Sequence, residues 1–491
     1  MSHRSMRVVL RAIAIATAAL VCAVPAALGS IHHRAWHARA ARQRSHPRQR
    51  AGFGGSLILG PRLNTAGGPP TSAQCIAQFG IACYDPQDMR NQYDFNPTYA
   101  PGNGDAGAGQ TIVIFDSFGS PTIRQDLTFF DDSYGIQPPP SFRIYQPEGT
   151  VTYPYLHDGA AASKSYQDRT EISWGYETTL DVEWAHAMAP NANIALVETP
   201  VAESEGVTGL QNLENAQQWA LENHIGTIWS NSYAATEQTF ENPSVVQRLN
   251  ALYHTAASQG ISAFFATGDL GAANYDKQCT GASPKCGVYP YPTVNFPSSS
   301  PDVVSVGGTE IPVPQPALES YNPEQNWNDG FGAGGGGYST VFGEPYYQAG
   351  IPDPTPPDPN TVPTRGLPDV SYNAALISSI LIYESFDPTA PPGWVPIGGT
   401  SAATPQWAAI DAIANSADGP LGFLTPRLYQ IYANKAEYAS AFHDILATNN
   451  SFDGVSGYSA GAGWDATSGI GTPDVNNLVQ ALRTTTSSPA P

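Results

Sequence analysis

Charged residues are scarce in this sequence, at 13% of 491 residues, whereas aromatic residues reach 10%. A disordered chain would carry far more charge and fewer aromatic residues, so this composition excludes one. After the N-terminal region, no uncharged apolar run approaches the roughly 20 residues that a membrane-spanning helix needs. The chain is therefore expected to be globular, without stable membrane insertion, and its 47 glycines and 44 prolines indicate many loops.

Acidic residues are absent from the first part of the chain and abundant afterwards. No Asp or Glu precedes Asp85, and from there on 12 basic residues stand against 42 acidic ones. Such an acidic body is unsuited to a phosphate backbone, so we expect no nucleic-acid partner. An acidic surface also suits a protein that works at low pH, where many carboxylates are protonated.

The N-terminus has the layout of a secretory signal. Arginines precede an apolar run over residues 12–27, and a small-residue cleavage site ends at Gly29. The run is short for a membrane span, and Val21 stands where a lipoprotein site at Cys22 would need a small residue. We therefore predict a cleaved signal peptide over residues 1–29 and secretion to the extracellular space.

Cysteine is rare, with five residues in the chain, one of which lies in the predicted signal. The other four form two close pairs, Cys75/Cys83 and Cys279/Cys286. An even count at close spacing in a secreted chain predicts two small disulfide loops. A zinc site is the alternative, but neither pair has CxxC spacing and no histidine cluster accompanies them.

The rest of the chain divides into three segments. Residues 30–74 are rich in arginine and lack apolar periodicity, which predicts a flexible basic linker or propeptide remnant. A single folded domain is expected over residues 75–484, followed by a flexible tail over residues 485–491. The four glycines at 334–337 lack the Gly-Lys-Ser/Thr of a phosphate loop and are expected to form a flexible substrate-side or crossover loop.

Short β-branched runs alternate with helical stretches in the folded domain. The expected strands are 111–116, 193–198, 226–230, 261–266 and 303–306. The expected helices are 171–188, 210–223 and 245–258. This alternation indicates an α/β fold with a doubly wound, mainly parallel sheet and helices on both faces, whose site lies at the carboxyl ends of the strands.

The stretch Gly398–Pro405, which reads GGTSAATP, holds the candidate nucleophile. Two glycines remove side-chain bulk before Ser401, and an alanine-rich segment with helix potential follows. Ser401 is thus expected on a sharp turn at a helix N-terminus, where free N–H groups and the helix dipole favour negative charge. A hydrolase needs this geometry at its nucleophile, although ordinary turn chemistry has the same residue pattern.

Three carboxyl groups are candidates to act with this serine. Glu177 and Asp181 lie four residues apart on one face of an apolar helix, and buried paired carboxylates share a proton, which makes one of them a titratable base. Asp269 ends an apolar strand between glycines, where a buried acid can stay protonated and donate to an oxyanion. The alternatives are a solvated acidic face and a turn or cap aspartate.

With these motifs the chain resembles the sedolisin family of serine-carboxyl peptidases, acid-acting relatives of the subtilisins. The similarity runs from about Gly109 to the C-terminus. The matching motifs are Glu-x-x-x-Asp at Glu177, Gly-Asp-x-Gly at Asp269, Gly-Thr-Ser-x-x-x-Pro at Ser401, Val306-Gly307-Gly308-Thr309, Pro368-Asp369-Val370-Ser371, Asp444-Ile445 and Gly461-Ala462-Gly463-Trp464-Asp465. The resemblance implies a subtilisin-like fold and an endopeptidase that forms an acyl-enzyme.

The resemblance also assigns roles to the candidate residues. Ser401 would be the nucleophile, Glu177 its general base, and Asp181 the group that orients Glu177 and shares its proton. Asp269 would stabilise the oxyanion together with the Ser401 backbone N–H, and Asp116 matches a position where some members extend the network. An ionised base and a protonated Asp269 coexist only in an acidic window, unlike in a subtilisin with its histidine base.

One structural Ca²⁺ site is implied as well. Its ligands map onto the carboxylates of Asp444 and Asp465 and the backbone carbonyls of Ile445, Gly461 and Gly463. Oxygen-only ligation of this kind suits calcium, and a glycine-rich turn with two unrelated acids is the alternative.

These inferences predict a secreted, calcium-stabilised, monomeric endopeptidase that acts on unfolded proteins or peptides at acid pH. The large folded prodomain usual in the family has no evident match in residues 30–74. A catalytically silent binding protein on the same fold is the alternative, and loss of Ser401, Glu177 or Asp269 would favour it. An esterase or acyltransferase would be expected to carry a Gly-x-Ser-x-Gly motif, which is missing around this serine.

Overall fold

The computed structural model describes residues 58–63, 68–159, 162, 166–202, 209–276, 287–351 and 362–485. The predicted signal peptide, most of the basic segment, the Cys279/Cys286 pair and the tail beyond Thr485 lie outside the described residues.

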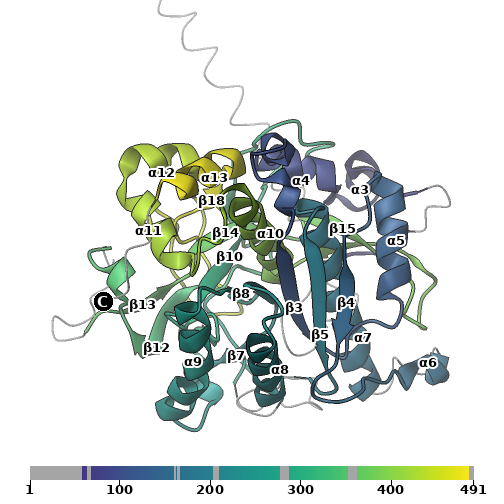
Figure 1. Ribbon diagram of the computed structural model, residues 1–491. Helices are drawn as coiled ribbons and strands as arrows, with labels where there is room; N and C mark the ends of the chain where they lie inside the picture. Colours follow the sequence, from purple (N-terminus) through teal and green to yellow (C-terminus); the bar gives the residue numbers. More distant parts are fainter. Residues whose placement is uncertain are drawn as a thin grey trace, which may run out of the picture. The chain divides into compact units, whose positions relative to one another are not determined.

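A central sheet of mostly parallel strands forms the middle of the fold (Figure 1). Its parallel part has the order β14-β10-β8-β6-β3-β5-β4, and β11 joins β10 in antiparallel pairing. The bounds are β3 (Thr111–Ser117), β4 (Phe142–Tyr145), β5 (Asn193–Thr199), β6 (Ile228–Asn231), β8 (Ser262–Ala266), β10 (Val304–Glu310), β11 (Gln325–Asn326) and β14 (Val370–Asn373). All five predicted strands are present in this sheet, which confirms the α/β prediction.

Helices cover both faces of the sheet because its inner strands are apolar on both sides. On β3, Ile112 and Ile114 pack in one hydrophobic core with α7 (Tyr166–Met188) and α10 (Thr400–Asp418). Val113 and Phe115 face the opposite core. That second core contains α8 (Leu210–Glu222) and α9 (Pro243–Ser258). The three predicted helices are thus confirmed as α7, α8 and α9.

The remaining elements surround this centre. The further helices are α3 (Ser72–Phe79), α4 (Pro86–Gln92), α5 (Ile123–Tyr134), α6 (Tyr155–Asp158), α11 (Thr425–Ala433), α12 (Lys435–Ala441) and α13 (Val475–Thr484). Short antiparallel pairs join β7 (Ala235–Thr236) to β9 (Asn295–Phe296), β12 (Gly337–Gly343) to β13 (Thr364–Leu367), and β17 (Phe442–His443) to β18 (Thr472–Pro473). Among the helices described, none has the length and apolar character needed to span a bilayer.

A second sheet corrects the predicted start of the folded domain. It has the order β1-β16-β15-β2, with β1 (Ile58–Leu59), β2 (Ala82–Tyr84), β15 (Ser378–Glu384) and β16 (Gly393–Gly398). Ile58 pairs with Gly398, so ordered structure begins well before Cys75. The linker prediction was wrong here because pairing with a distant strand, rather than local periodicity, orders this segment. The predicted Cys75–Cys83 disulfide is present, and it joins α3 to β2.

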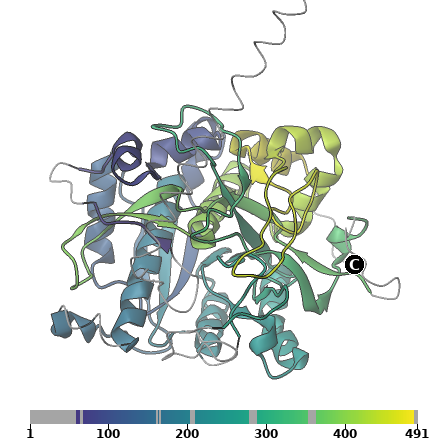
Figure 2. The ribbon, with the colours of Figure 1, turned by 180° about the vertical axis from the view of Figure 1, so that it is seen from behind.

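The glycine-rich segment is also different from the prediction. A Cβ atom added to Gly334 would lie 2.7 Å from the Gly308 carbonyl oxygen, and one added to Gly335 would lie 2.4 Å from the Thr267 carbonyl oxygen. At Gly336 the corresponding distance to the Ala466 carbonyl oxygen is 2.3 Å. Only glycine allows the backbone to approach these carbonyl groups so closely. The segment is therefore tightly packed against other parts of the backbone and is not a flexible loop. Figure 2 shows from behind the loop between β17 and β18, drawn in yellow, to which Ala466 belongs.

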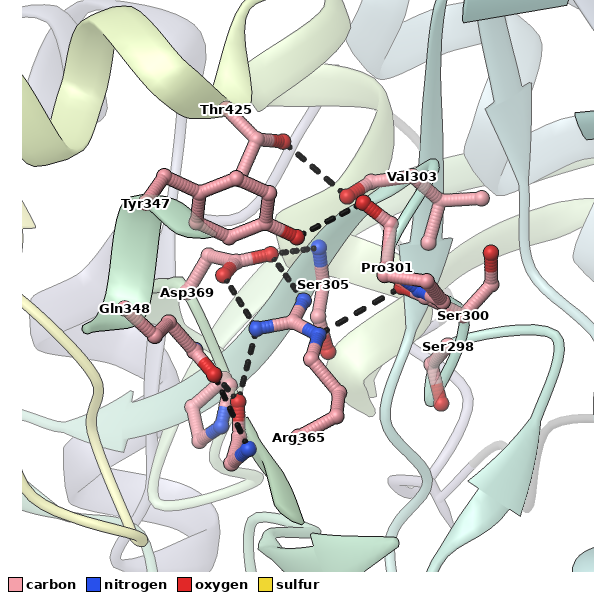
Figure 3. A network of polar contacts seen from close by, with 12 residues as sticks. Ser298, Ser300, Pro301, Val303, Ser305, Tyr347, Gln348, Arg365, Asp369 and Thr425 are labelled. Atoms are coloured by element: carbon pink, nitrogen blue, oxygen red, sulfur yellow. Dashed lines mark hydrogen bonds and ion pairs between the residues drawn. The ribbon is translucent and has the colours of Figure 1, made fainter. Parts of the chain in front are cut away.

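A buried ion pair fastens β13 beside β14 (Figure 3). The Arg365 guanidinium donates to both carboxylate oxygens of Asp369, with N–O distances of 2.7 and 2.5 Å. The Tyr429 hydroxyl and the Ser305 backbone N–H donate to the same carboxylate, each at 2.8 Å. Both charges are therefore neutralised and hydrogen-bonded inside the fold, as a buried ion pair requires.

Candidate active site

The candidate nucleophile lies where β16 turns into α10. Gly399 is the N-cap of the helix with a φ angle of 144°, and Ser401 is the second helical residue. A Cβ on Gly399 would lie 2.8 Å from Asp269 Oδ2, so this glycine provides both the backbone angle and the space. The Gly399 N–H donates to the Ala374 carbonyl oxygen at 2.6 Å. These contacts place the Ser401 side chain, which is buried, at the positive end of a helix.

Glu177 and Asp181 come from α7, which packs against α10 in the same core. Both side chains are buried, and burial raises the pKa of each carboxyl well above its usual range. The neighbouring Asp181 charge raises the pKa of Glu177 further, whereas the Ser401 hydroxyl lowers it. Ser401 thus lies beside Glu177, although Ser401 Oγ and Glu177 Oε1 stop short of standard hydrogen-bond geometry with any described residue.

Asp116 and Ser232 complete this carboxyl cluster. The Ser232 hydroxyl donates to Asp181 Oδ1 at 3.0 Å. Asp116, near the carboxyl end of β3, is fully buried, and burial raises its pKa to about 8. The Thr178 hydroxyl lowers that pKa and the Glu198 carboxylate raises it. Asp116 in turn raises the pKa of Asp181, so the two groups titrate in one electrostatic unit.

Asp269 approaches the nucleophile turn from the carboxyl end of β8. Its Oδ1 accepts hydrogen bonds from the Thr400 backbone N–H at 2.7 Å and the Thr400 hydroxyl at 2.8 Å. Burial raises the pKa of Asp269 to about 7, and the Thr400 contacts lower it. Oδ2 has no hydrogen-bonding partner among the described residues and lies against Gly399. Because Oδ1 already accepts two hydrogen bonds, protonation falls on Oδ2, which becomes a donor at the turn before Ser401.

No cation neutralises these groups within the described part of the chain. None of the ion pairs found there includes Glu177, Asp181, Asp116 or Asp269. Like-charged buried carboxyls without a cation cannot all ionise near neutral pH, so the cluster can store and transfer protons.

Comparison with known proteins identifies the family of this chain. A model described as "Subtilase family" matches residues 166–463, which is more than half of the chain. The chain belongs to the subtilase family.

The curated relatives of this subtilase confirm the resemblance to the sedolisin family. Kumamolisin of Bacillus sp. (strain MN-32) is 30% identical over 409 residues, which cover 81% of this chain and 63% of the relative. Sedolisin of Pseudomonas sp. (strain 101) is 29% identical over 401 residues, which cover 80% of this chain and 61% of the relative. The chain thus spans less than two thirds of the length of either relative.

A solved structure of Pseudomonas sedolisin, described as a serine-carboxyl proteinase complexed with two molecules of pseudo-iodotyrostatin, has the same fold. Its TM-score is 0.62 at 26% identity, over 82% of this chain and 99% of that chain. The predicted subtilisin-like architecture is therefore confirmed.

The predicted calcium ligands of this subtilase lie in the loop between β17 and β18. The Gly463 N–H donates to both oxygens of Asp444, at 3.2 and 2.9 Å, and the Gly461 N–H donates to Asp465 Oδ2 at 2.8 Å. Burial, Asp444 and Asp465 all raise the pKa of the Tyr438 hydroxyl, so both carboxylates act on one neighbour. Both carboxylates therefore lie near Tyr438, and the backbone N–H groups of Gly461 and Gly463 donate to them.

This donor set fits a calcium ion only with backbone oxygens included. In the described residues, no group of three or more His, Cys, Asp or Glu side chains is arranged to hold a metal. Two carboxylates plus carbonyl oxygens on a glycine-bent loop remain chemically appropriate for Ca²⁺.

Several residues of the site escaped sequence reasoning. Thr400 and Ser232 orient the carboxyls, but a hydroxyl carries no distinctive signal when its partner is remote in sequence. Glu198 was detectable in principle, because Asp116 and Glu198 both stand near the ends of buried strands and are direct neighbours in the β3–β5 register.

His186 contacts the Gln137 carbonyl oxygen at 3.0 Å and Asp131 at 3.4 Å, which accords with a structural role.

Proposed function

We propose that this subtilase is a secreted, acid-acting serine-carboxyl endopeptidase that hydrolyses peptide bonds of unfolded proteins or peptides. The observation that carries the proposal is the position of Ser401 at a helix N-terminus between two sets of buried carboxyls that have no cation among the described residues. The structure of Pseudomonas sedolisin, which is described as a serine-carboxyl proteinase, supports it. Protein or peptide substrates, secretion and a monomeric state are part of the same proposal.

In the first step, the carboxyl pair on α7 acts as general base. Repulsion between Glu177 and Asp181 opposes ionisation of both, so the pair holds one proton and one negative charge over a broad pH range. With the charge on Glu177 and the proton on Asp181, Glu177 accepts the Ser401 proton while Oγ attacks the substrate carbonyl carbon. Ser232, which donates to Asp181, holds that carboxyl in place.

Charge then develops on the substrate carbonyl oxygen. Two donors meet it: the protonated Oδ2 of Asp269 and the backbone N–H of Ser401 at the helix N-terminus. When the tetrahedral intermediate collapses, the peptide C–N bond breaks and the protonated Glu177 gives its proton to the leaving amine. Water then attacks the Ser401 ester with the same base, which releases the acid product and restores the serine.

The pH dependence follows from the two carboxyl roles. Activity is lost at the alkaline side as Asp269 ionises, because burial sets its pKa at about 7 and the ionised form no longer donates. Activity is lost at the acidic side when the Glu177/Asp181 pair gains its second proton and no base remains. Only an acidic window satisfies both conditions.

The deciding experiment is hydrolysis of a denatured protein at about pH 4 and about pH 8 by the wild-type chain and by Ser401→Ala. Cleavage confined to acid pH and abolished by the substitution is expected. An activity maximum near pH 8 would contradict the carboxyl mechanism. A folded sample that cleaves at neither pH would favour the alternative, a silent binding protein on this fold.

We also propose that the loop between β17 and β18 holds one structural Ca²⁺. The carboxylates of Asp444 and Asp465 and the carbonyls of Ile445, Gly461 and Gly463 would bind it. The ion would supply positive charge to a loop in which burial raises the pKa of Asp465, so the expected role is in stability.

A further inference from the structure

A second pair of buried carboxyls lies behind the oxyanion residue, and the proposed mechanism does not use it. Glu310 ends β10, and Asp329 follows β11. Their exposed fractions are 2% and 3%. No ion pair within the described chain includes either of them. Burying two carboxyls without a cation costs free energy of folding, so a compensating role in function is expected.

One oxygen of Asp329 organises the backbone beside Asp269. Asp329 Oδ1 accepts hydrogen bonds from the N–H groups of Phe331 at 2.7 Å and Gly332 at 3.1 Å. The next residue, Ala333, donates its N–H to the Asp269 carbonyl oxygen at 3.0 Å and accepts from the Gly271 N–H at 2.8 Å. The turn that Asp329 closes therefore holds the backbone of the Asp269 turn directly.

The other oxygen of Asp329 reaches the nucleophile side. Asp329 Oδ2 accepts the Ile377 N–H at 3.3 Å. Three residues earlier, the Ala374 carbonyl oxygen accepts the N–H of Gly399, the N-cap of the Ser401 helix. A single carboxyl group thus ties together the segments that position Asp269 and Ser401.

Glu310 stands behind Asp329 as its electrostatic partner. Glu310 Oε1 accepts from the Gln325 side chain, and Oε2 accepts the Asn328 N–H at 3.3 Å. Burial raises the pKa of Glu310 to about 8, and the Asp329 charge contributes to that rise. Burial also raises the pKa of Asp329. Repulsion between the two carboxyls opposes the ionisation of both, which favours a state with one proton and one negative charge on the pair.

The charge of Asp329 acts on Asp269, and Asp269 acts in turn on the candidate base Glu177. Asp329 faces Asp269 at the end of β8 and raises its pKa. Asp269 in turn faces Glu177 on α7 and raises the pKa of that base. Gln325 on β11 and the backbone donors around the pair are neutral. The negative charge of the Asp329/Glu310 pair is therefore not cancelled there, and it disfavours ionisation of Asp269.

We propose that Asp329, with Glu310 behind it, is a positioning residue for the peptidase reaction: its carboxyl holds the segments around Asp269 and Ser401, and its negative charge keeps Asp269 in the protonated, donating form. The proposal rests on the proposed function, and it extends that function to two residues which touch neither substrate nor nucleophile.

The pair offers a test in which two substitutions act in opposite directions. Glu310→Gln confines the negative charge to Asp329, the nearer neighbour of Asp269, so protonated Asp269 becomes more favoured. Asp329→Asn keeps one acceptor for the Phe331 and Gly332 N–H groups but leaves the charge on the more distant Glu310. A purely structural role would lower activity in both variants without moving the pH profile in opposite directions.

The experiment measures kcat/KM against pH for a peptide substrate, with each profile normalised to its own maximum so that the amount of folded enzyme cancels. The pH at which kcat/KM falls on the alkaline side, or limb, of the profile is expected to decrease by about one unit in Asp329→Asn and to increase by about half a unit in Glu310→Gln. Glu214→Gln is the matched control, because Glu214 is a buried carboxyl on α8 whose pKa burial raises to about 8. Its limb is expected to stay in place.

The proposal would be overturned if the alkaline side of the pH profile shifted in the same direction in both variants, or if it shifted in neither of them. If Asp329→Asn does not fold, Glu310→Gln decides alone: an upward shift supports the proposal and an unchanged or lowered limb overturns it. If the wild type cleaves no peptide, the proposed function fails by itself. The Asp269 pKa is then followed in the same proteins by NMR of ¹³C-labelled aspartate, assigned with Asp269→Asn, and the same opposite shifts decide.

Discussion

Asp369, which directly precedes β14, and Asp116, which lies in β3, are both fully buried aspartates, but their surroundings differ. Asp369 meets the Arg365 guanidinium and the Ser305 backbone N–H (Figure 3), and the Tyr429 hydroxyl also donates to it, so both of its oxygens are satisfied. Asp116 has neither oxygen in a standard hydrogen bond to any described residue, and the charged groups that interact with it are the carboxyls of Glu198, Asp181 and Glu177.

The difference distinguishes a carboxylate that stabilises the fold, Asp369, from a carboxyl that can gain and lose a proton, Asp116. A buried carboxylate with a cation and several donors stays ionised and links the elements around it. A buried carboxyl without them costs stability and has a raised pKa, which is the condition that proton transfer near neutral or acid pH requires. Each of the following predictions tests one side of this contrast, in order of decreasing effect.

The largest expected effect is on catalysis at the titratable cluster. Glu177→Gln is expected to lower kcat about 1,000-fold, because the base is lost while the side-chain shape is kept. The free energy of unfolding at neutral pH is expected to rise, since the variant removes one of two repelling buried carboxyls. Steady-state kinetics and urea unfolding measure the two effects. Retention of more than about a tenth of the activity would place the base elsewhere.

The ion pair is expected to respond in the opposite way. Arg365→Met should destabilise the fold by about 3–5 kcal/mol, because Asp369 is left buried without its cation. Activity per folded molecule should change little. Urea unfolding measures the loss, and a double variant Arg365→Met/Asp369→Asn should recover part of it. A loss below about 1 kcal/mol in the single variant would show that water or rearrangement replaces the cation.

Asp269 should make stability depend on pH. Its folded pKa of about 7 lies above the ordinary value of 3.8, so the folded state binds this proton more tightly than the unfolded state. The corresponding stabilisation is complete below about pH 4 and is lost as pH rises to about 7, with a total of about 4 kcal/mol. Asp269→Asn should remove this slope in urea unfolding measured between those pH values. An unchanged slope would assign it to other groups.

The smallest expected effect concerns the loop between β17 and β18. Chelation of calcium should lower the free energy of unfolding by about 3 kcal/mol when the ion had been present at 100 times its Kd. Asp444→Asn should remove the response to calcium, and the Asp453→Asn variant should retain it, because Asp453 lies in the same loop but is not one of the expected ligands. Equal stability with and without calcium in the wild type would contradict a structural ion.

Local sequence patterns were sufficient for five strands of the central sheet, for three of its helices and for part of the site. The apolar runs at β3, β5, β6, β8 and β10 and the helical periodicity of α7 to α9 depend on neighbouring residues, so they could be predicted. The spacing of Glu177 and Asp181 put them on one helix face for the same reason. Their partnership with Ser401 needed the resemblance to a family, since no local pattern joins residues more than 200 positions apart.

The sequence by itself determined five strands of the central sheet, the helices α7 to α9, the first disulfide and the turn before Ser401, because each depends on chain-local geometry. Only the tertiary structure decided that Ile58 pairs with Gly398, that the glycines at 334–336 pack against the backbone of distant segments, and that Asp329 links the segments around Asp269 and Ser401. These contacts bring together segments that are distant in sequence, and packing, not local preference, selects them. The pKa values of the buried carboxyls follow from the same packing, since burial is the first cause of each shift.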